Sequence, residues 1–460
     1  MTAIHRLSAL DAAFLDMETE RTPMHVAAVG RIEGGRLLDA RGHVRLSVVG
    51  RHVAGRLHLV PRLRQVVHYV PFGLGRPVWV DDENFDLANH VRVVRINPPG
   101  NETQLYHLAC EVSMLPLDRG HPLWELVFVE GLADGSIGLI EKVHHALADG
   151  IAAVAVTAVL ADLEPRTAVE RPRPWTPTAR PTDVELAVEA ATAIVAEPIQ
   201  MAHHIVHAAA HPIETTQSAL GLWDGLRMLI RRAPYSAFNR PVGTNRSLTR
   251  VSMPLAAVKK IAHAHGATVN DVVLALVAGG LRAALVARGE PCVDVDALVP
   301  HNVRAKGAEL ALENLVTAFI VPLPVHEHDS VERVALVRNA MRERRRHHQS
   351  EALSTLESVS NHLLPAFTAA LARMVHHQPF VNVVVTNVPG PESNLYVIGG
   401  QLTDLVPIVP LAGNLTIGFA VLSYAGQLTV GVFADVEACP DVDVLSTKMK
   451  ADLHHLARRA

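Results

Sequence analysis

The sequence predicts an α/β protein built from two similar-sized domains with mixed sheets, joined by a proline-rich and partly helical linker. Both halves alternate short runs rich in Val, Ile and Leu with longer stretches of helical periodicity, which is typical of helices packed on sheets. Residues 165–182 carry five prolines, which favours an extended connection. We therefore expect a first domain at residues 1–164, a linker at 165–235 and a second domain at 236–460.

Composition narrows the class of protein. A chain of 460 residues that is 49% hydrophobic can bury sizeable cores. Its formal net charge of -4 gives no basic footprint for nucleic acid. Three widely spaced cysteines form no CxxC pair, and the acidic N-terminus predicts no signal peptide, so we expect a cytoplasmic protein. No uncharged apolar run reaches the roughly 18 residues of a membrane-spanning helix.

Local signals predict the elements of the first half. Ser8 and Asp11 have the spacing of a capping box, which indicates the start of a short helix. A strand follows at residues 25–32. An Asp-Gly pair at 134–135 lies between two apolar runs and predicts a hairpin. After that hairpin, small and branched residues predict a helix at 150–164.

The second half repeats the mixture of helices and strands. Helices are predicted at residues 267–285 and 330–348, strands at 296–304, 315–324 and 380–391, and a hairpin at 414–435. Between the halves, residues 183–232 have a helical pattern broken by Pro198 and Pro212.

One histidine pair stands out through its surroundings. The stretch HHALADG begins at His144 and His145, and HH also occurs at 203, 347, 376 and 454. The first pair alone is followed by xxxDG and lies between a predicted strand and a predicted helix. Neutral imidazole can take a proton from an attacking hydroxyl group and return it to a leaving thiolate. The pair is therefore a candidate for a catalytic base.

Asp149 and Gly150 have a structural interpretation that is compatible with a role in the site. Asp149 stands before the predicted helix, where it can cap the first backbone N–H groups. Gly150 would allow chains to approach closely. A carboxylate held in this way can also fix the loop that aims an imidazole.

Other kinds of site are less well supported by the sequence. There is no GxSxG nucleophile elbow, and the cysteines have no histidine partner in sequence. His203, His207 and His211 would line one helix face, but no Cys or Glu ligand pattern joins them and Pro212 follows at once. A solvated or lipid-facing stripe is the favoured interpretation, and we expect no metal.

HHxxxDG followed by an Ala/Val-rich helix resembles the CoA-dependent acyltransferase superfamily. Further blocks resemble one member, the bacterial wax ester synthase/diacylglycerol acyltransferases. These blocks are LSALDAAFL, TPMHV, HPLWE at 121–125, ATVNDVVLA at 267–275, TNVPGP at 386–391, LYVIGGQL and LSYAGQLTVGVFAD. They occur in order between residues 7 and 435, which makes the resemblance specific.

The resemblance implies an acyl-CoA-dependent O-acyltransferase with two chloramphenicol-acetyltransferase-like domains and an active site in a tunnel between them. It implies that His145 is the general base, that His144 supports it and that Asp149 is structural. In related condensation domains an arginine of an LR motif pairs with this aspartate. Arg64 fits that motif, with Arg62 as the less favoured alternative and a surface charge as the bland interpretation.

The second half contributes further candidates. Asn270 would belong to the site architecture at the domain interface, whereas Asp271 has the spacing of a helix cap with Thr268. The oxyanion formed from a thioester needs a hydrogen-bond donor. Thr386 and Asn387 are candidates by position, and Ser423 is the alternative.

The implied substrates are a long-chain acyl-CoA and either diacylglycerol or a long-chain fatty alcohol, with no separate cofactor and no nucleic acid. Because these lipids are apolar, we expect peripheral contact with a membrane or lipid droplets. Residues 183–232 are the candidate segment, and helix packing between the domains is the alternative. The basic run at 342–348 would either meet CoA phosphates or form a solvated helix face.

Several positions depart from the family pattern, so the identity of the alcohol that accepts the acyl group stays open. They are His301, Asn302, Glu313 and the block FNRPVGTNRSL. Two other functions stay open: an acyltransferase or condensation enzyme of secondary metabolism, and a catalytically weak protein that coats lipid droplets. The complete HHxxxDG motif argues against the last of these.

Overall fold

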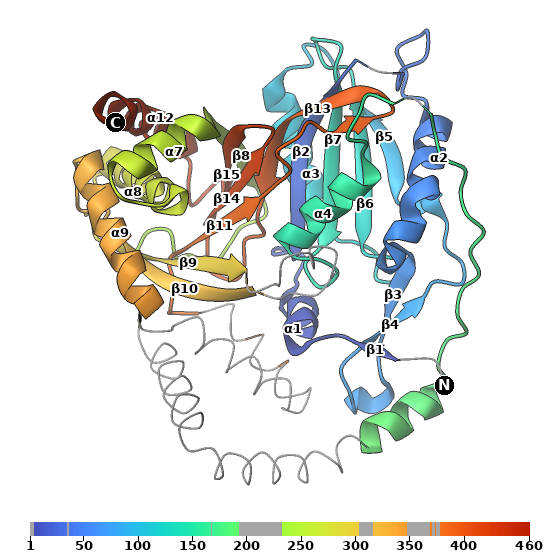
Figure 1. The fold of residues 1–460 in the computed structure, drawn as a ribbon. Coiled ribbons are helices and arrows are strands. Elements are labelled where there is room, and N and C mark those ends of the chain that lie inside the picture. The colour runs from blue at the N-terminus through green and yellow to red at the C-terminus, as the bar shows by residue number, and fades with distance from the viewer. Residues whose placement is uncertain are drawn as a thin grey trace.

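Two large sheets and one small sheet organise the part of the chain that the structure describes. The computed structural model describes residues 4–34, 36–166, 168–192, 232–302, 316–346, 369, 373 and 378–460. Each large sheet has six strands, and helices cover both sheets (Figure 1). The predicted α/β class is confirmed.

The first large sheet contains the strand that ends at the histidine pair. Its strand order is β12-β13-β2-β7-β6-β5. Its strands are β2 (His25–Glu33), β5 (Val91–Arg95), β6 (Trp124–Glu130), β7 (Ile137–His144), β12 (Tyr396–Val397) and β13 (Gly400–Ile408). Strands β6 and β7 form the antiparallel hairpin that the Asp-Gly pair predicts.

Two of these strands come from the second half of the chain. Strand β13 pairs antiparallel with β2, with a register shift between Thr403 and Val406. Leu402 and Tyr424 also belong to the core of the first half. The predicted boundary needs one correction, because not all of residues 236–460 stay in the second domain. Strands β12 and β13 complete the first sheet, whereas β14 and β15 belong to the second.

Helices cover both faces of the first sheet. They are α1 (Ala9–Met17), α2 (Leu46–Arg56), α3 (Glu102–Met114) and α4 (Gly150–Leu160). Along β7, Leu139 and Val143 pack in the core that contains α2 and α4, whereas Ile140 packs in the core that contains α3. This alternation follows from the two-residue period of a strand.

A small sheet lies beside the first one. Its strand order is β1-β4-β3, with β1 (His5–Arg6), β3 (Gln65–His68) and β4 (Val78–Asp81). Helical residues 183–192, which end the described part of the linker, pack against it through Leu186 and Ala190. The proline-rich residues 168–182 form neither helix nor strand.

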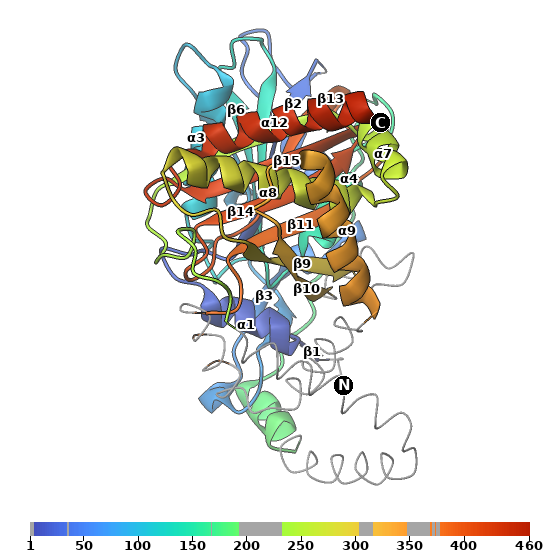
Figure 2. The same ribbon diagram turned by 90° about the vertical axis from the view of Figure 1, so that its left-hand side faces the viewer.

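The second large sheet has the strand order β10-β9-β11-β14-β15-β8. Its strands are β8 (Arg246–Pro254), β9 (Val295–Asn302), β10 (Val316–Leu323), β11 (Val383–Pro389), β14 (Ile417–Tyr424) and β15 (Gln427–Asp435). Helices α7 (Leu255–Ala264), α8 (Val269–Ala287), α9 (Ser330–Arg346) and α12 (Val442–Arg459) cover it (Figure 2).

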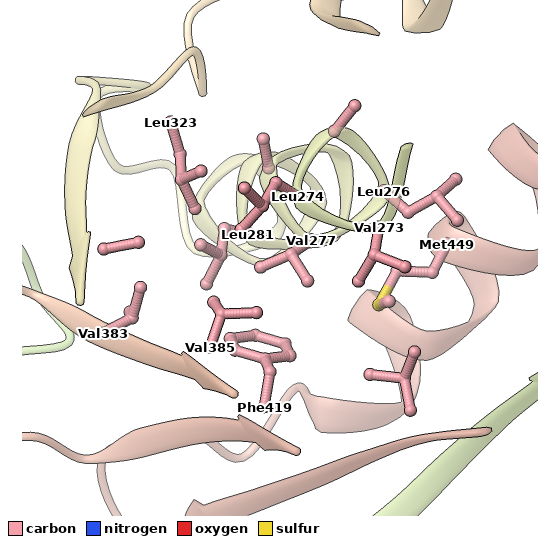
Figure 3. Packing of buried hydrophobic residues seen from close by; sticks show 14 of the residues in the cluster. Val273, Leu274, Leu276, Val277, Leu281, Leu323, Val383, Val385, Phe419 and Met449 are labelled. Carbon is pink, nitrogen blue, oxygen red and sulfur yellow. The ribbon is translucent and has the colours of Figure 1, made fainter. Parts of the chain in front are cut away.

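Helix α8 is the centre of the second core. Leu274, Val277 and Leu281 point toward Val385 and Phe419 on the sheet (Figure 3). Among the described residues, α8 is the one helix long and apolar enough to cross a membrane, but 72% of that window is buried inside the protein. Packing within the second half accounts for its apolar composition.

Candidate active site

The histidine pair stands on a strand-to-helix turn. Strand β7 ends at His144 and α4 begins at Gly150. Oδ1 of Asp149 accepts hydrogen bonds from the backbone N–H groups of Ile151 (3.0 Å) and Ala152 (2.9 Å). The predicted N-cap is confirmed, and such a cap is worth about 1 kcal/mol.

Two loops hold the backbone of the pair in place. The N–H of His144 donates to the carbonyl of Leu123 (3.0 Å), and the N–H of His145 donates to the carbonyl of Met24 (2.7 Å). Met24 lies in the TPMHV block and Leu123 in the HPLWE block. Both blocks therefore clamp the same turn, which gives each of them a physical role near the histidines.

The His145 ring is half-buried and stacks on Phe14 of α1. The two ring centroids lie 3.9 Å apart with an interplanar angle of 15°. Helix α1 is fixed by the predicted capping box between Ser8 and Asp11, which is confirmed. The stacking restrains the imidazole plane, and the residue as a whole stays partly exposed.

His144 is fully buried and has a different environment. Its Nδ1 accepts a hydrogen bond from the N–H of Ala146 (2.9 Å), and its Nε2 lies 3.4 Å from Oε1 of Glu18. Nδ1 is therefore unprotonated, and Nε2 carries the proton of the neutral ring. Burial lowers the pKa of His144 to about 4, against the attraction of Glu18. His144 is neutral at pH 7 and pins the loop that presents His145.

Glu18 is the centre of a buried polar network that the sequence did not predict. Its Oε1 lies 3.4 Å from Nε2 of His25 and accepts from the N–H of Met24 (3.2 Å). Its Oε2 accepts from Arg119 (2.9 Å). Burial opposes ionisation of Glu18, but hydrogen bonds from His144 and His25 and from Arg119 outweigh it and lower its pKa. Neither periodicity nor motif spacing signals this glutamate.

The beginning of α4 meets the second half of the chain. A Cβ at Gly150 would lie 3.0 Å from Cγ2 of Val388 on β11, so the glycine permits the close approach predicted from the sequence. On the same strand, Nδ2 of Asn387 donates to Oδ1 of Asn270 at the start of α8 (3.2 Å). The turn after β7, the end of β11 and the start of α8 therefore converge.

Asp271 closes the capping box at the start of α8. The Thr268 N–H donates to its Oδ2 (2.8 Å), and the Asp271 N–H donates to Oγ1 of Thr268 (3.2 Å). The predicted cap is confirmed, and it orients the helix end on which Asn270 stands.

The three oxyanion candidates lie at neighbouring strand ends. Thr386 and Asn387 are on β11, and Ser423 is on the adjacent β14, where it pairs with Pro389. The carbonyl and the hydroxyl of Ser423 both accept from the N–H of Gly390, at 2.9 and 3.3 Å. Ser423 thus shapes the turn after β11, and the donor to an oxyanion stays a prediction.

Arg64 lies beside the proline-rich linker. Its guanidinium lies 4.9 Å from the ring centroid of Trp175 in the proline-rich linker, and Asp81 is its electrostatic partner. Arg62 lies over Trp79, at 4.8 Å. The last turn before β3 directs this side chain toward the linker, where it lies over an indole ring. The pairing of Arg64 with Asp149 stays a prediction.

Some candidates lie outside the described residues. These are the histidines at 203, 207 and 211, Glu313, and most of the segment 183–232. His301 is described, and its ring centroid lies 5.7 Å from that of Phe319. In the described part of the chain, no group of three or more His, Cys, Asp or Glu side chains could hold a metal ion.

The sequence matches known protein families. Residues 7–273 match the wax ester synthase/diacylglycerol acyltransferase catalytic domain, and residues 312–457 match the WS/DGAT C-terminal domain. The probable diacylglycerol O-acyltransferase tgs1 of Mycobacterium tuberculosis is 32% identical over 452 residues, which cover 96% of this chain and 94% of that protein.

Solved structures show the same fold. The wax ester synthase/diacylglycerol acyltransferase of Marinobacter aquaeolei VT8 is 24% identical, with a TM-score of 0.68 and 99% of each chain covered. The starter condensation domain of rhizomide synthetase, solved in complex with C8-CoA, is 14% identical, with a TM-score of 0.60 and coverage of 100% of this chain and 95% of that chain.

The family models and the curated relatives together identify an acyltransferase, and the chain carries the HHxxxDG motif on a strand-to-helix turn. Within that class, the chain belongs to the wax ester synthase/diacylglycerol acyltransferase family and is an O-acyltransferase. The resemblance drawn from the sequence motifs is confirmed, and so is the two-domain fold that it implies.

Proposed function

We propose that this enzyme transfers a long acyl chain from acyl-CoA to the hydroxyl group of diacylglycerol or of a long-chain fatty alcohol, with His145 as the general base. The observation that carries the proposal is the mounting of His145: a half-buried imidazole, stacked on Phe14, on a turn fixed from both sides. The reaction takes acyl-CoA as substrate and needs no further cofactor.

In the proposed reaction, His145 accepts the proton of the acceptor hydroxyl as its oxygen attacks the thioester carbonyl carbon. The new C–O bond gives a tetrahedral oxyanion. When the oxyanion collapses, the C–S bond breaks, and the imidazolium returns the proton to the CoA thiolate. The products are an ester and free CoA, and no covalent intermediate forms on the protein.

The two histidines would have different roles, positioning for His144 and proton transfer for His145. His144 is a poor base because it is buried, because its Nδ1 already accepts from Ala146, and because its pKa lies near 4. It would act as a positioning residue whose ring fixes the path of the loop. His145 is partly exposed, in contrast to the fully buried His144, and would meet the acceptor.

Two observations on other proteins support the choice of substrates. The condensation domain of similar fold was solved in complex with C8-CoA, an acyl-CoA. The relatives in Mycobacterium tuberculosis and Marinobacter aquaeolei are named for diacylglycerol acyl transfer, and the second is named for wax ester synthesis as well. A cytoplasmic enzyme at a lipid surface could use both alcohols.

The test is to incubate purified protein with a long-chain acyl-CoA plus diacylglycerol or a long-chain alcohol, and to follow free CoA thiol. We expect acceptor-dependent release that falls about 100-fold or more in His145→Ala. His107→Ala is the matched control, because that histidine is exposed on α3 and pairs only with Glu111. It should leave the rate unchanged.

Unchanged thiol release in His145→Ala would exclude the general-base role. Absence of release with either acceptor would exclude the proposed substrates. It would favour a non-lipid acceptor of secondary metabolism, or a protein that binds lipid droplets without turnover.

A further inference from the structure

One loop presents an aromatic side chain to solvent in an unusual backbone conformation. Phe72 is 94% exposed and has φ 58° and ψ 10°, in the left-handed region that bulky residues rarely adopt. Pro71 precedes it and Gly73, with φ 64°, follows it. Such a conformation persists when the surrounding structure imposes it, which points to a role for the exposed ring.

The loop is anchored on both sides of Phe72. Val70 is buried, and Leu74 is partly buried in the same small cluster, which also contains Leu186 and Ala190 of the helical residues 183–192. The backbone N–H of Gly73 donates to the carbonyl of Val70 (3.2 Å). The exposure of Phe72 is therefore a consequence of a fixed loop and not of a missing core.

The neighbouring helix exposes apolar residues at the same end of the protein. Val184 and Val188 are 72% and 57% exposed, one helical turn apart and opposite the buried Leu186. The helix and the Phe72 loop lie side by side in both views, at the lower end of the molecule (Figures 1 and 2). Phe72, Val184 and Val188 are called the Phe72 face below.

A chain of hydrogen bonds connects this end to the active site. Tyr69, three residues before Phe72, accepts a hydrogen bond from Nη1 of Arg119 (2.8 Å). Nη2 of the same arginine donates to the carbonyl of Leu15 (2.7 Å) and to Glu18 (2.9 Å), which faces His144. The Phe72 face thus lies close to the helix that holds the His145 ring.

The charge and the size of the Phe72 face indicate the kind of partner that binds there. The helix behind the face carries Asp183, Glu185 and Glu189, and its ion pairs use His68 and Arg6. Arg6, Arg76 and Arg180 balance these three acids, so the surround carries no net charge that would attract nucleic acid or another highly charged partner. A single protruding ring with two valines is also too small for a stable protein interface. A ring on a polar rim is instead the arrangement that enters the interface of a lipid layer.

We propose that the Phe72 face docks on the surface of a zwitterionic phospholipid layer, with the Phe72 ring inserted below the head groups. The proposal rests on the proposed function in one respect: a water-insoluble acceptor gives the enzyme a reason to sit on a lipid phase. Because the surround carries no net charge, apolar insertion supplies the affinity. Binding then needs neither anionic lipid nor low salt.

The test is flotation of the purified protein with phosphatidylcholine vesicles. Wild-type protein should float, Phe72→Ser should bind about 10-fold or more weakly, and the Val184→Ser, Val188→Ser double variant should lose part of the binding. Tyr235→Ser is the matched control, because Tyr235 is 88% exposed in the second half of the chain. It should float like the wild type, and raising the salt should change nothing.

Flotation of Phe72→Ser at the wild-type level would overturn the proposal, and so would an equal loss in Tyr235→Ser. A fall in the unfolding temperature of Phe72→Ser without loss of flotation would also overturn it, since the ring would then contact another part of this chain. CoA thiol release with a water-soluble short-chain alcohol as acceptor should be equal in Phe72→Ser and wild type. Absence of thiol release from wild type with diacylglycerol and with a long-chain alcohol would contradict the proposed function while leaving the flotation result intact.

Discussion

Oε1 of Glu18 and Nε2 of His144 face each other at 3.4 Å behind the proposed catalytic base. The same carboxylate faces His25 and binds Arg119, so one buried charge joins α1, β2, β7 and the loop after α3. This relationship ties the position of the His145 turn to an ionised group on the far side of His144. Removing the charge of Glu18 should therefore disturb the position of the turn.

We expect Glu18→Gln to weaken both the fold and the turn. Gln keeps the size of Glu but removes the charge that His144, His25 and Arg119 surround, and hydrogen bonds to a buried charge are worth about 1.5–3 kcal/mol. Denaturant unfolding should show a loss of that order, and kcat should fall more than KM rises. The exposed Glu20→Gln is the matched control. Unchanged stability and kcat in Glu18→Gln would show that the charge is dispensable.

The lowered pKa of His144 predicts that acid destabilises the folded protein. Its pKa in the folded state is about 4, below the ordinary value of 6.5, so the unfolded chain binds the proton first as pH falls. The unfolding free energy should be unaffected above pH 6.5 and decrease between pH 6.5 and 4. The size of this decrease is on the order of 3 kcal/mol. Urea unfolding at pH 7 and pH 5 measures it, and His144→Gln should flatten the slope. An equal slope in both proteins would contradict the assignment.

The raised pKa of Glu141 predicts the opposite dependence of stability on pH. It is buried on β7, its partner is the Thr157 hydroxyl of α4, and burial raises its pKa to about 7. The neutral form is favoured in the fold, so its contribution is complete below pH 4.5 and is lost as pH rises through 7. Glu141→Gln should leave stability unchanged near pH 4.5 and raise the melting temperature at pH 8. A lower melting temperature at pH 8 would show that the carboxylate has a partner that favours its charge.

Asp149 allows its capping role to be separated from a chemical one. Asparagine caps a helix about as well as aspartate, whereas alanine costs about 1 kcal/mol. We expect Asp149→Ala to lower the unfolding free energy by that amount and to reduce kcat, and Asp149→Asn to keep most of both. Thermal unfolding and the thiol assay measure the pair. An Asp149→Asn protein with normal stability and no activity would assign a direct role to the charge.

Local sequence signals predicted many of the helices and strands. The capping boxes at Ser8 and Thr268 and the cap at Asp149 depend on neighbours within three residues, so spacing alone predicts them. The hairpin between β6 and β7 follows from an Asp-Gly pair for the same reason. Strand β13 was missed as a member of the first sheet, because its apolar pattern suits either sheet and only tertiary pairing decides between them.

The candidate site likewise contains residues that local signals predict and residues that they do not. The histidine pair was visible because strand, turn and helix signals surround it. Glu18 was not visible, because its partners His25, Arg119 and His144 come from distant parts of the chain. Arg64 was assigned to Asp149 on a resemblance, but its direction depends on Trp175, a linker residue with no periodic signal.

The pairing of β13 with β2 has a mechanical consequence. Residues 400–408 cross from one half of the chain to the other and are bonded along the edge of the first sheet. A separation of the two large sheets would have to break that ladder or bend the connections that join β12 and β13 to β11 and β14 of the second sheet. A fragment that ends before β13 would also leave β2 as an open edge, and such edges recruit other chains.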